Sequence, residues 1–185
     1  MAYVTVAQAV SASRKSFGTR SIAETAMRKS AATSIEMRFD IFLSHSHEDS
    51  EVISGVKEMI EQEGLTAYVD WIDDPQTDRS RVTADTADML RKRMKNCNCL
   101  LYVSTKTSTK SKWMPWELGY FDGMKPGNVG LLPVVESPGN RFVGQEYLGL
   151  YPYYEYIDFT VGRHLGHYIS NTKAKMLKTA ARGSR

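Results

Sequence analysis

The sequence predicts an α/β fold: a flavodoxin-like, doubly wound parallel five-stranded sheet flanked by helices, with an N-terminal arm and a C-terminal helix. Short apolar or β-rich runs alternate along the chain with segments whose apolar residues recur at helical spacing. Strands that alternate with helices in this way form parallel sheets. The length of 185 residues suits one domain with extensions. We expect a basic, partly helical arm at 1–37, the domain at 38–160, and a basic helix and tail at 161–185.

Five segments have the composition of strands. The first, 39–44, is a short apolar run typical of a buried strand. The others are apolar, alternating or rich in aromatic residues: 65–71, 99–104, 129–135 and, as an edge strand, 147–157. Ligands of such sheets bind at the carboxyl ends of the strands. Polar or aromatic side chains stand at three of these ends, at 44–47, 70–71 and 104–105.

Four helices are predicted between and after the strands, at 48–63, 83–95, 113–124 and 163–180. Gly64 ends the first of them, because glycine readily adopts the left-handed conformation of a helix C-cap. Thr83 is a suitable N-cap for the second. The segments 72–82 and 105–112 are polar loops. The last predicted helix is basic and amphipathic.

The composition excludes several classes of protein. Hydrophobic residues make up 42% of the chain and charged residues 24%, as in ordinary soluble domains. The net charge of +3 is too small to indicate nucleic-acid binding, which needs a concentrated basic face. No apolar run approaches the roughly 18 residues that a membrane span requires. We therefore expect neither nucleic acid nor membrane as a partner.

Two features bear on the cellular compartment. The first 37 residues are basic and rich in Ser, Thr and Ala, a composition that resembles an organellar transit peptide. We prefer the alternative of a partly helical arm with scattered apolar contacts. Cys97 and Cys99 stand two residues apart, where a disulfide would be strained and two ligands would not make a zinc site. We interpret them as reduced thiols and expect a cytoplasmic protein.

Trp113 and Glu117 form the most informative pair in the sequence. They stand four residues apart at the start of a predicted helix, so they share one helix face. An indole beside a carboxylate suits a nucleotide sugar that carries a cationic leaving base. The alternative for Glu117 is a solvated glutamate favoured by the helix dipole. Trp116 points elsewhere on the helix, and we expect it in the core.

Four motifs together resemble the Toll/interleukin-1 receptor (TIR) domain family over roughly 38–160. The run 39–46 is similar to the first-strand signature of that family, and 67–70 is similar to its second strand. The loop 72–82 stands where TIR domains have their BB loop, although it lacks the glycines of receptor-type loops. The segment 111–117 resembles the one that carries the catalytic glutamate of NAD-cleaving members. The version here is similar to stand-alone bacterial TIR proteins, which include Thoeris anti-phage sensors.

The resemblance implies an enzyme that cleaves the nicotinamide–ribose bond of NAD, with Glu117 as the catalytic residue. Cleavage builds positive charge on the anomeric carbon, and a nearby carboxylate stabilises that charge. Nicotinamide is already cationic in NAD and leaves without a general acid, so one carboxylate suffices. NAD is then a substrate, and neither a cofactor nor a metal is expected. The implied product is nicotinamide plus a linear, cyclic or conjugated ADP-ribose derivative that signals to a separate effector.

The substrate-binding residues that we expect lie around the strand ends, the loop and the helix start: Trp113, Ser44, His45, Ser46, Phe42, Asp70, Trp71, Arg79 and Arg81. The two arginines are candidates for the pyrophosphate, with ordinary loop charge as the alternative. Trp71 either stacks on a base or has a core or loop-anchoring role. His45 and His47 stand beside Glu48 and Asp49, but the chain turns into a helix here, which does not favour a metal site.

Two other functions compete with the enzyme. The first is a non-enzymatic TIR module that acts through its BB loop and self-assembly, which would need neither Trp113 nor Glu117. The second is a receiver domain on the same type of sheet. A receiver needs acidic residues after the first strand and a phosphoacceptor Asp after the third, but the chain has Ser44-His45 and Ser104-Thr105 there. We also expect self-association, in which loop 72–82 closes a pocket across an interface.

Overall fold

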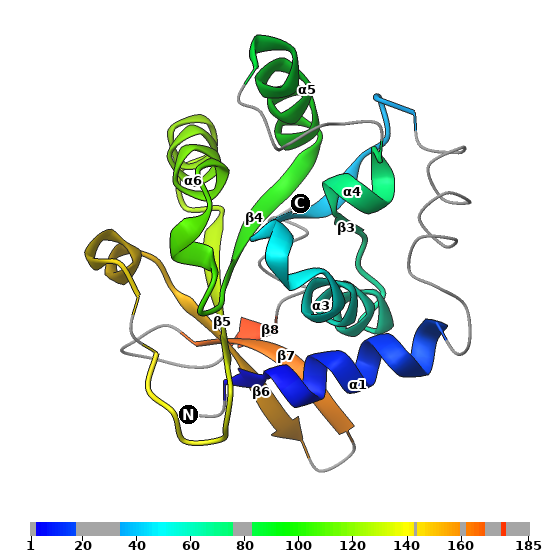
Figure 1. Ribbon diagram of the computed structural model, residues 1–185, viewed down its shortest axis with the longest axis vertical. Helices are drawn as coiled ribbons and strands as arrows, with labels where there is room; N and C mark the ends of the chain where they lie inside the picture. Colours follow the sequence, from blue (N-terminus) through cyan, green and yellow to red (C-terminus); the bar gives the residue numbers. More distant parts are fainter. Residues whose placement is uncertain are drawn as a thin grey trace.

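The computed structural model describes residues 3–17, 34–75, 83–142, 144–159, 162–168 and 175–176. Five parallel strands form the centre of the sheet, in the order β3-β2-β4-β5-β6. Their bounds are β2 Phe39–Ser44, β3 Ala67–Tyr68, β4 Cys97–Ser104, β5 Val129–Val135 and β6 Tyr153–Phe159. The predicted parallel five-stranded α/β sheet is therefore confirmed (Figure 1).

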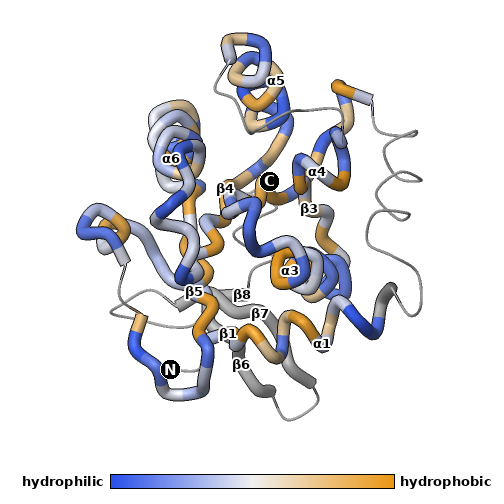
Figure 2. The backbone as a smooth tube through the Cα atoms, viewed as in Figure 1, coloured by the Kyte–Doolittle hydropathy of each residue, from blue (hydrophilic) through white to orange (hydrophobic). Residues whose placement is uncertain are grey.

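Helices cover both faces of this sheet (Figure 1). The described helices are α1 Val6–Phe17, α3 Ser50–Gln62, α4 Asp70–Asp73, α5 Ala84–Lys95 and α6 Trp113–Met124, with 3-10 turns η1 His47–Asp49, η2 Ser108–Lys110 and η3 Glu146–Leu150. Successive side chains of a strand point to opposite faces. Accordingly Leu43 belongs to the apolar cluster under α1 and α3, and Phe42 to the cluster under α5 and α6. Figure 2 shows hydrophobic residues along the central strands and on α1 and α3.

The first part of the N-terminal arm, including helix α1, is seated on the domain. β1, Val4–Thr5, pairs in parallel with the end of β5. Helix α1 lies against α3, and Ala9 is fully buried there. A Cβ atom at Gly55 would lie 1.7 Å from the Ala9 carbonyl oxygen, so only glycine permits this approach. Residues 18–33 of the arm lie outside the described residues.

The predicted C-terminal helix at 163–180 is wrong. Gly162–Tyr168 is strand β7, which pairs antiparallel with β6, and Lys175–Met176 is the short strand β8 beside it. Gly162 and Gly166 weaken a helix, and tertiary pairing decides the state of a segment with weak preference. The tail at 181–185 lies outside the described residues.

The predicted second strand is also too long. Only Ala67–Tyr68 pairs with β2, and Asp70 and Trp71 begin the one-turn helix α4. Asp73 explains the early end, since its carboxylate accepts a hydrogen bond of 2.8 Å from the Val69 amide. A side chain that binds a nearby backbone amide competes with strand pairing. In the described part of the chain, no helix is long and apolar enough to cross a membrane.

Candidate active site

The site forms where the direction of the strand order reverses. From β2 the chain passes to β3 on one side and then to β4 on the other, and sheets with such a reversal bind ligands beyond the carboxyl ends of the two central strands, the edge that we call the crevice. Ser44 ends β2 opposite Tyr102 of β4. The next two residues, His45 and Ser46, are buried at this edge, 2% and 4% exposed. These three predicted site residues therefore lie together.

Glu117 lies against this strand end. Its Oε2 atom accepts a hydrogen bond of 2.6 Å from the Ser44 hydroxyl, and both side chains are fully buried. The alternative of a solvated helix-start glutamate is therefore wrong. Burial, Tyr147 and the charge of Glu117 together raise the pKa of the Tyr102 phenol. A buried carboxylate that is aligned by a hydroxyl is suited to stabilising positive charge on a bound molecule.

The two tryptophans of α6 have different surroundings. Trp113 shares the inward face of the helix with Glu117, as predicted, and is only 6% exposed. Trp116 was expected in the core, but it is half-buried and stacks on Tyr120 with ring centroids 5.7 Å apart. The guanidinium of Arg91 lies 5.3 Å from the Trp116 ring. Trp116 is not in the core because α6 turns the face with Trp113 and Glu117 inward. The hydrogen bond from Ser44 offsets the cost of burying the Glu117 carboxylate.

His45 and Asp70 form a second polar pair beside Ser44. The His45 Nδ1 atom lies 2.8 Å from the Leu43 carbonyl oxygen, which only accepts, so Nδ1 carries a proton. The Nε2 atom lies 3.2 Å from Asp70 Oδ1. The distance is that of an ion pair, although the two atoms are not aligned as a hydrogen bond. Both side chains are almost fully buried, which places this pair at the inner wall of the crevice.

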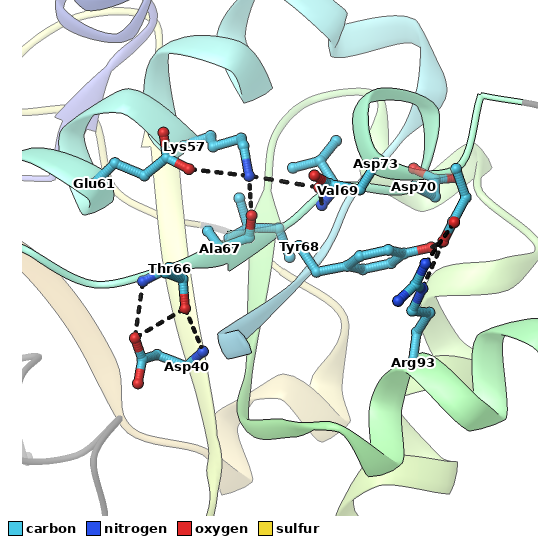
Figure 3. Close-up of polar contacts among 12 residues, drawn as sticks. Asp40, Lys57, Glu61, Thr66, Ala67, Tyr68, Val69, Asp70, Asp73 and Arg93 are labelled. Carbon is cyan, nitrogen blue, oxygen red and sulfur yellow. Dashed lines mark hydrogen bonds and ion pairs between the residues drawn. The ribbon is translucent and has the colours of Figure 1, made fainter. Parts of the chain in front are cut away.

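Buried Arg93 fixes the end of α4 from the helix layer of α5 (Figure 3). Its Nε and Nη2 atoms donate to the two carboxylate oxygens of Asp74 at 2.7 and 2.6 Å. The Tyr68 hydroxyl donates to the same carboxylate at 2.8 Å. Burial disfavours the charge of Arg93, but its hydrogen bonds to Asp74 more than offset this and raise the pKa of Arg93. Such a bidentate pair holds both position and orientation.

Lys57 fixes α4 from the opposite helix layer (Figure 3). From α3, its ammonium group donates to the Ala67 carbonyl oxygen and lies 3.5 Å from Asp73 and 3.2 Å from Glu61. Asp73 in turn holds the Val69 amide. The short helix is thus held from both faces of the sheet, and Asp70 at its start is held against His45.

Asp49 joins the opposite wall of the crevice to η1. Its carboxylate accepts hydrogen bonds from the hydroxyl groups of Thr105, at 2.6 Å, and Thr107. Lys110 pairs with Glu48 at 3.0 Å. These contacts fix the segment between β4 and α6, and hence the start of the helix that carries Glu117.

Of the remaining predicted site residues, the structure describes Phe42 and Trp71. Phe42 is a core residue beneath Ser44, and its ring stacks on Tyr68 with centroids 5.2 Å apart. Trp71 is half-buried, and its Nε1 atom is buried without a hydrogen-bond partner among the described residues. Arg79 and Arg81 lie outside the described residues. Over the described ranges, no three His, Cys, Asp or Glu side chains are grouped so as to hold a metal ion.

The sequence reasoning did not find Arg93, Asp74 or Tyr68. Arg93 stands among other basic residues of α5, a pattern typical of a solvated helix face. Asp74 stands in a run of loop-like acidic residues. No local signal distinguishes such a pair from surface charge, because only the fold brings the two side chains together.

Comparison with known proteins shows what the chain is similar to. A family model described as the TIR domain matches residues 41–167. The "Probable 3' cyclic ADP-D-ribose synthase ThsB'" of Bacillus cereus (strain MSX-D12) is 53% identical over 116 residues, which are 62% of this chain and 60% of that protein. The "Putative cyclic ADP-D-ribose synthase TIR2" of Cytobacillus dafuensis is 32% identical over 83 residues, 44% of this chain and 22% of that protein.

A solved structure also resembles the chain. It is the TIR domain of the Toll-related receptor TRR-2 of Hydra magnipapillata, with 17% identity and a TM-score of 0.44. The alignment covers 60% of this chain and 78% of the receptor domain.

Proposed function

Because the chain belongs to the TIR domain family, we propose that it is an NAD glycohydrolase or cyclase with Glu117 as its catalytic residue. The observation that supports this most directly is the buried hydrogen bond of 2.6 Å from Ser44 to Glu117 at the strand-order reversal. The names of the two curated relatives indicate cyclic ADP-ribose synthesis. NAD is the source of ADP-ribose in such a reaction, so NAD is the proposed substrate.

The geometry supports a single-carboxylate mechanism. The bond between nicotinamide nitrogen and the ribose anomeric carbon breaks, and nicotinamide leaves as a neutral molecule with the bonding electron pair. The Glu117 carboxylate stabilises the positive charge that grows on the sugar. The hydrogen bond from the Ser44 hydroxyl fixes the position of this carboxylate. A hydroxyl group of the same molecule then attacks the anomeric carbon to give a ring, or water attacks to give ADP-ribose, and a proton is released.

We favour a cyclic product. Exclusion of water from the reactive sugar favours ring closure over hydrolysis, and the names of both curated relatives indicate cyclic products. The product would act as a cytoplasmic signal to a separate effector protein in defence against phage. The chain matches about 60% of the length of the first relative, so the effector partner is part of this proposal.

Incubation of the purified full chain with NAD tests the function. We expect release of nicotinamide together with a product that has the mass of NAD minus nicotinamide, as a cyclic ADP-ribose has. A product heavier by one water indicates hydrolysis, and conjugates are separated by mass. No nicotinamide release at any protein concentration, with or without phage-infected extract as a trigger, would reject the enzyme and favour the adaptor function.

We also propose that activity needs self-association. Arg93 holds Asp74 within the domain. The rest of loop 72–82 would complete the pocket from a neighbouring copy. Turnover per enzyme should rise with protein concentration, in parallel with light scattering, and fall on charge reversal of Arg79 or Arg81. Constant turnover from a monomer across the dilution series would reject this requirement without affecting the proposed chemistry.

A further inference from the structure

A cavity of about 200 Å³ opens between the carboxyl ends of β4 and β5. Residues 104–106 form one wall, 134–136 the other, and 140–142 fold over it from the following loop. The two strands pair as far as Ser104 and Pro133. Beyond that point the last residues of β5 pair with β1. The cavity therefore lies where the pairing of β4 with β5 has ended and β1 holds the end of β5.

The lining of this cavity is cationic with an aromatic wall. Lys106 pairs with Glu136 at 3.2 Å, and both side chains are largely exposed. Arg141 is exposed and makes no ion pair within the described part of the chain. The half-buried Phe142 ring is held edge-on by Tyr153, with centroids 5.6 Å apart. Because Glu136 pairs with Lys106, the guanidinium of Arg141 is the charged group in this lining that can bind an anion. A guanidinium with a flat apolar surface beside it suits a phosphate and its attached nucleoside.

The position of the cavity relates it to Glu117. The crevice with Ser44 and Glu117 lies between β2 and β4, and the cavity lies between β4 and β5. Strand β4 borders both places, so they are neighbours along the same edge of the sheet. The diphosphate of a dinucleotide follows directly after its nicotinamide ribose. A single molecule can therefore occupy both places.

We propose that this cavity binds the diphosphate of the dinucleotide, with Arg141 as its main contact and Phe142 beside the adjoining nucleoside. The proposal rests on the proposed function, because it assigns the second half of the same substrate. Thr105 separates the two places, and its hydroxyl is held by Asp49. This contact fixes the rim over which the bound dinucleotide would lie.

The binding of ADP tests the cavity independently of turnover, because ADP has the diphosphate but no nicotinamide bond to cleave. Calorimetric titration of the full chain should show ADP binding that weakens about tenfold in Arg141→Gln, the size expected for one charge-assisted contact. The same variant should raise KM for NAD and leave kcat within about twofold. Arg38→Gln is the matched control, since Arg38 is exposed and precedes β2 at the other end of the sheet. It should bind ADP like the wild type.

Two results would overturn the proposal: equal ADP affinity of the wild type and Arg141→Gln, or ADP that binds without competing with NAD. The outcomes separate this proposal from the proposed function. A wild-type chain that binds ADP through Arg141 but cleaves no NAD keeps the diphosphate site and rejects the enzyme. A chain that cleaves NAD with no dependence on Arg141 rejects the diphosphate site and keeps the enzyme.

Discussion

The Ser44 hydroxyl donates a hydrogen bond of 2.6 Å to the Glu117 carboxylate, and neither side chain is exposed to solvent. The two residues stand 73 positions apart and come from the end of β2 and the second turn of α6. A buried carboxylate costs free energy unless it is hydrogen-bonded. The fold therefore holds one charged oxygen in a fixed position at the edge of the sheet where ligands bind.

We expect Glu117→Gln to remove NAD cleavage, by about 10²–10³ in rate or more, with the fold intact. The amide oxygen still accepts from Ser44, so the variant loses the charge and keeps the contact. Nicotinamide release and circular dichroism, measured on the same preparation, check both parts. Wild-type turnover by this variant would show that Glu117 is not catalytic.

Ser44→Ala should act through Glu117. It removes a hydrogen bond to a charged group, typically about 1.5–3 kcal/mol, and should lower kcat by roughly ten- to a hundredfold. In the double variant with Glu117→Gln, the serine change should add almost nothing, because the carboxylate it aligns is gone. If the loss in the double variant instead equals the sum of the losses in the two single variants, Ser44 acts on the substrate separately.

The sequence was sufficient to predict the parallel sheet and the cluster of polar residues at its carboxyl edge, because both follow from local periodicity and strand order. It also placed Trp113 and Glu117 on one helix face. It could not tell which face of α6 is buried. Glutamate side chains are ordinarily exposed, and Glu117 is buried because it accepts a hydrogen bond from Ser44, a contact that only the fold creates. The C-terminal strands were missed because the pairing of β7 with β6, and of β8 with β7, is a tertiary contact that the sequence pattern does not reveal.

We expect Trp113 to contribute more to the stability of the fold than Trp116. The sequence analysis, which placed Trp116 in the core, suggested the reverse. Trp113 is 6% exposed in the core, so Trp113→Ala should lower the free energy of unfolding by about 3–5 kcal/mol. Trp116 is half-buried, and Trp116→Ala should cost clearly less. Urea unfolding of both variants gives the comparison. A larger loss for Trp116→Ala would contradict the placement of α6.

Arg93→Met should destabilise the chain by about 3–5 kcal/mol, because it leaves the Asp74 carboxylate buried without its main partner. Arg91→Met on the same helix is the matched control. The Arg91–Asp88 pair is 41% and 63% exposed, and an exposed pair contributes about 1 kcal/mol or less. Equal losses in the two variants would mean that the buried pair does not anchor α4.

The stability of the chain should fall above about pH 9. Burial raises the pKa of Cys99 to about 12 and raises the pKa of Cys97, from an ordinary value of 9.0. Burial likewise raises the pKa of Tyr68 and Tyr154 from 10.0. As the pH rises, the unfolded chain therefore loses these protons before the folded chain does. The free energy of unfolding then falls by up to about 1.4 kcal/mol per pH unit for each group that titrates. Urea unfolding at pH 7, 9 and 10.5 checks this, and a constant midpoint would contradict it.

Gly55→Ala should weaken the seat of α1 on the domain. The new Cβ atom would meet the Ala9 carbonyl oxygen at 1.7 Å, and a backbone atom cannot move aside without shifting the helix. Overpacking of this kind typically costs about 1–3 kcal/mol. Gly119→Ala is the matched control, because Gly119 lies on the exposed side of α6 with no atom within 4 Å of the added Cβ. It should be neutral or stabilise the chain by up to about 1 kcal/mol.

Trypsin provides a second measurement, since Arg14 and Lys15 stand near the end of α1. Cleavage there should become faster in Gly55→Ala and stay unchanged in Gly119→Ala. If both variants unfold and cleave like the wild type, α1 is not held against α3.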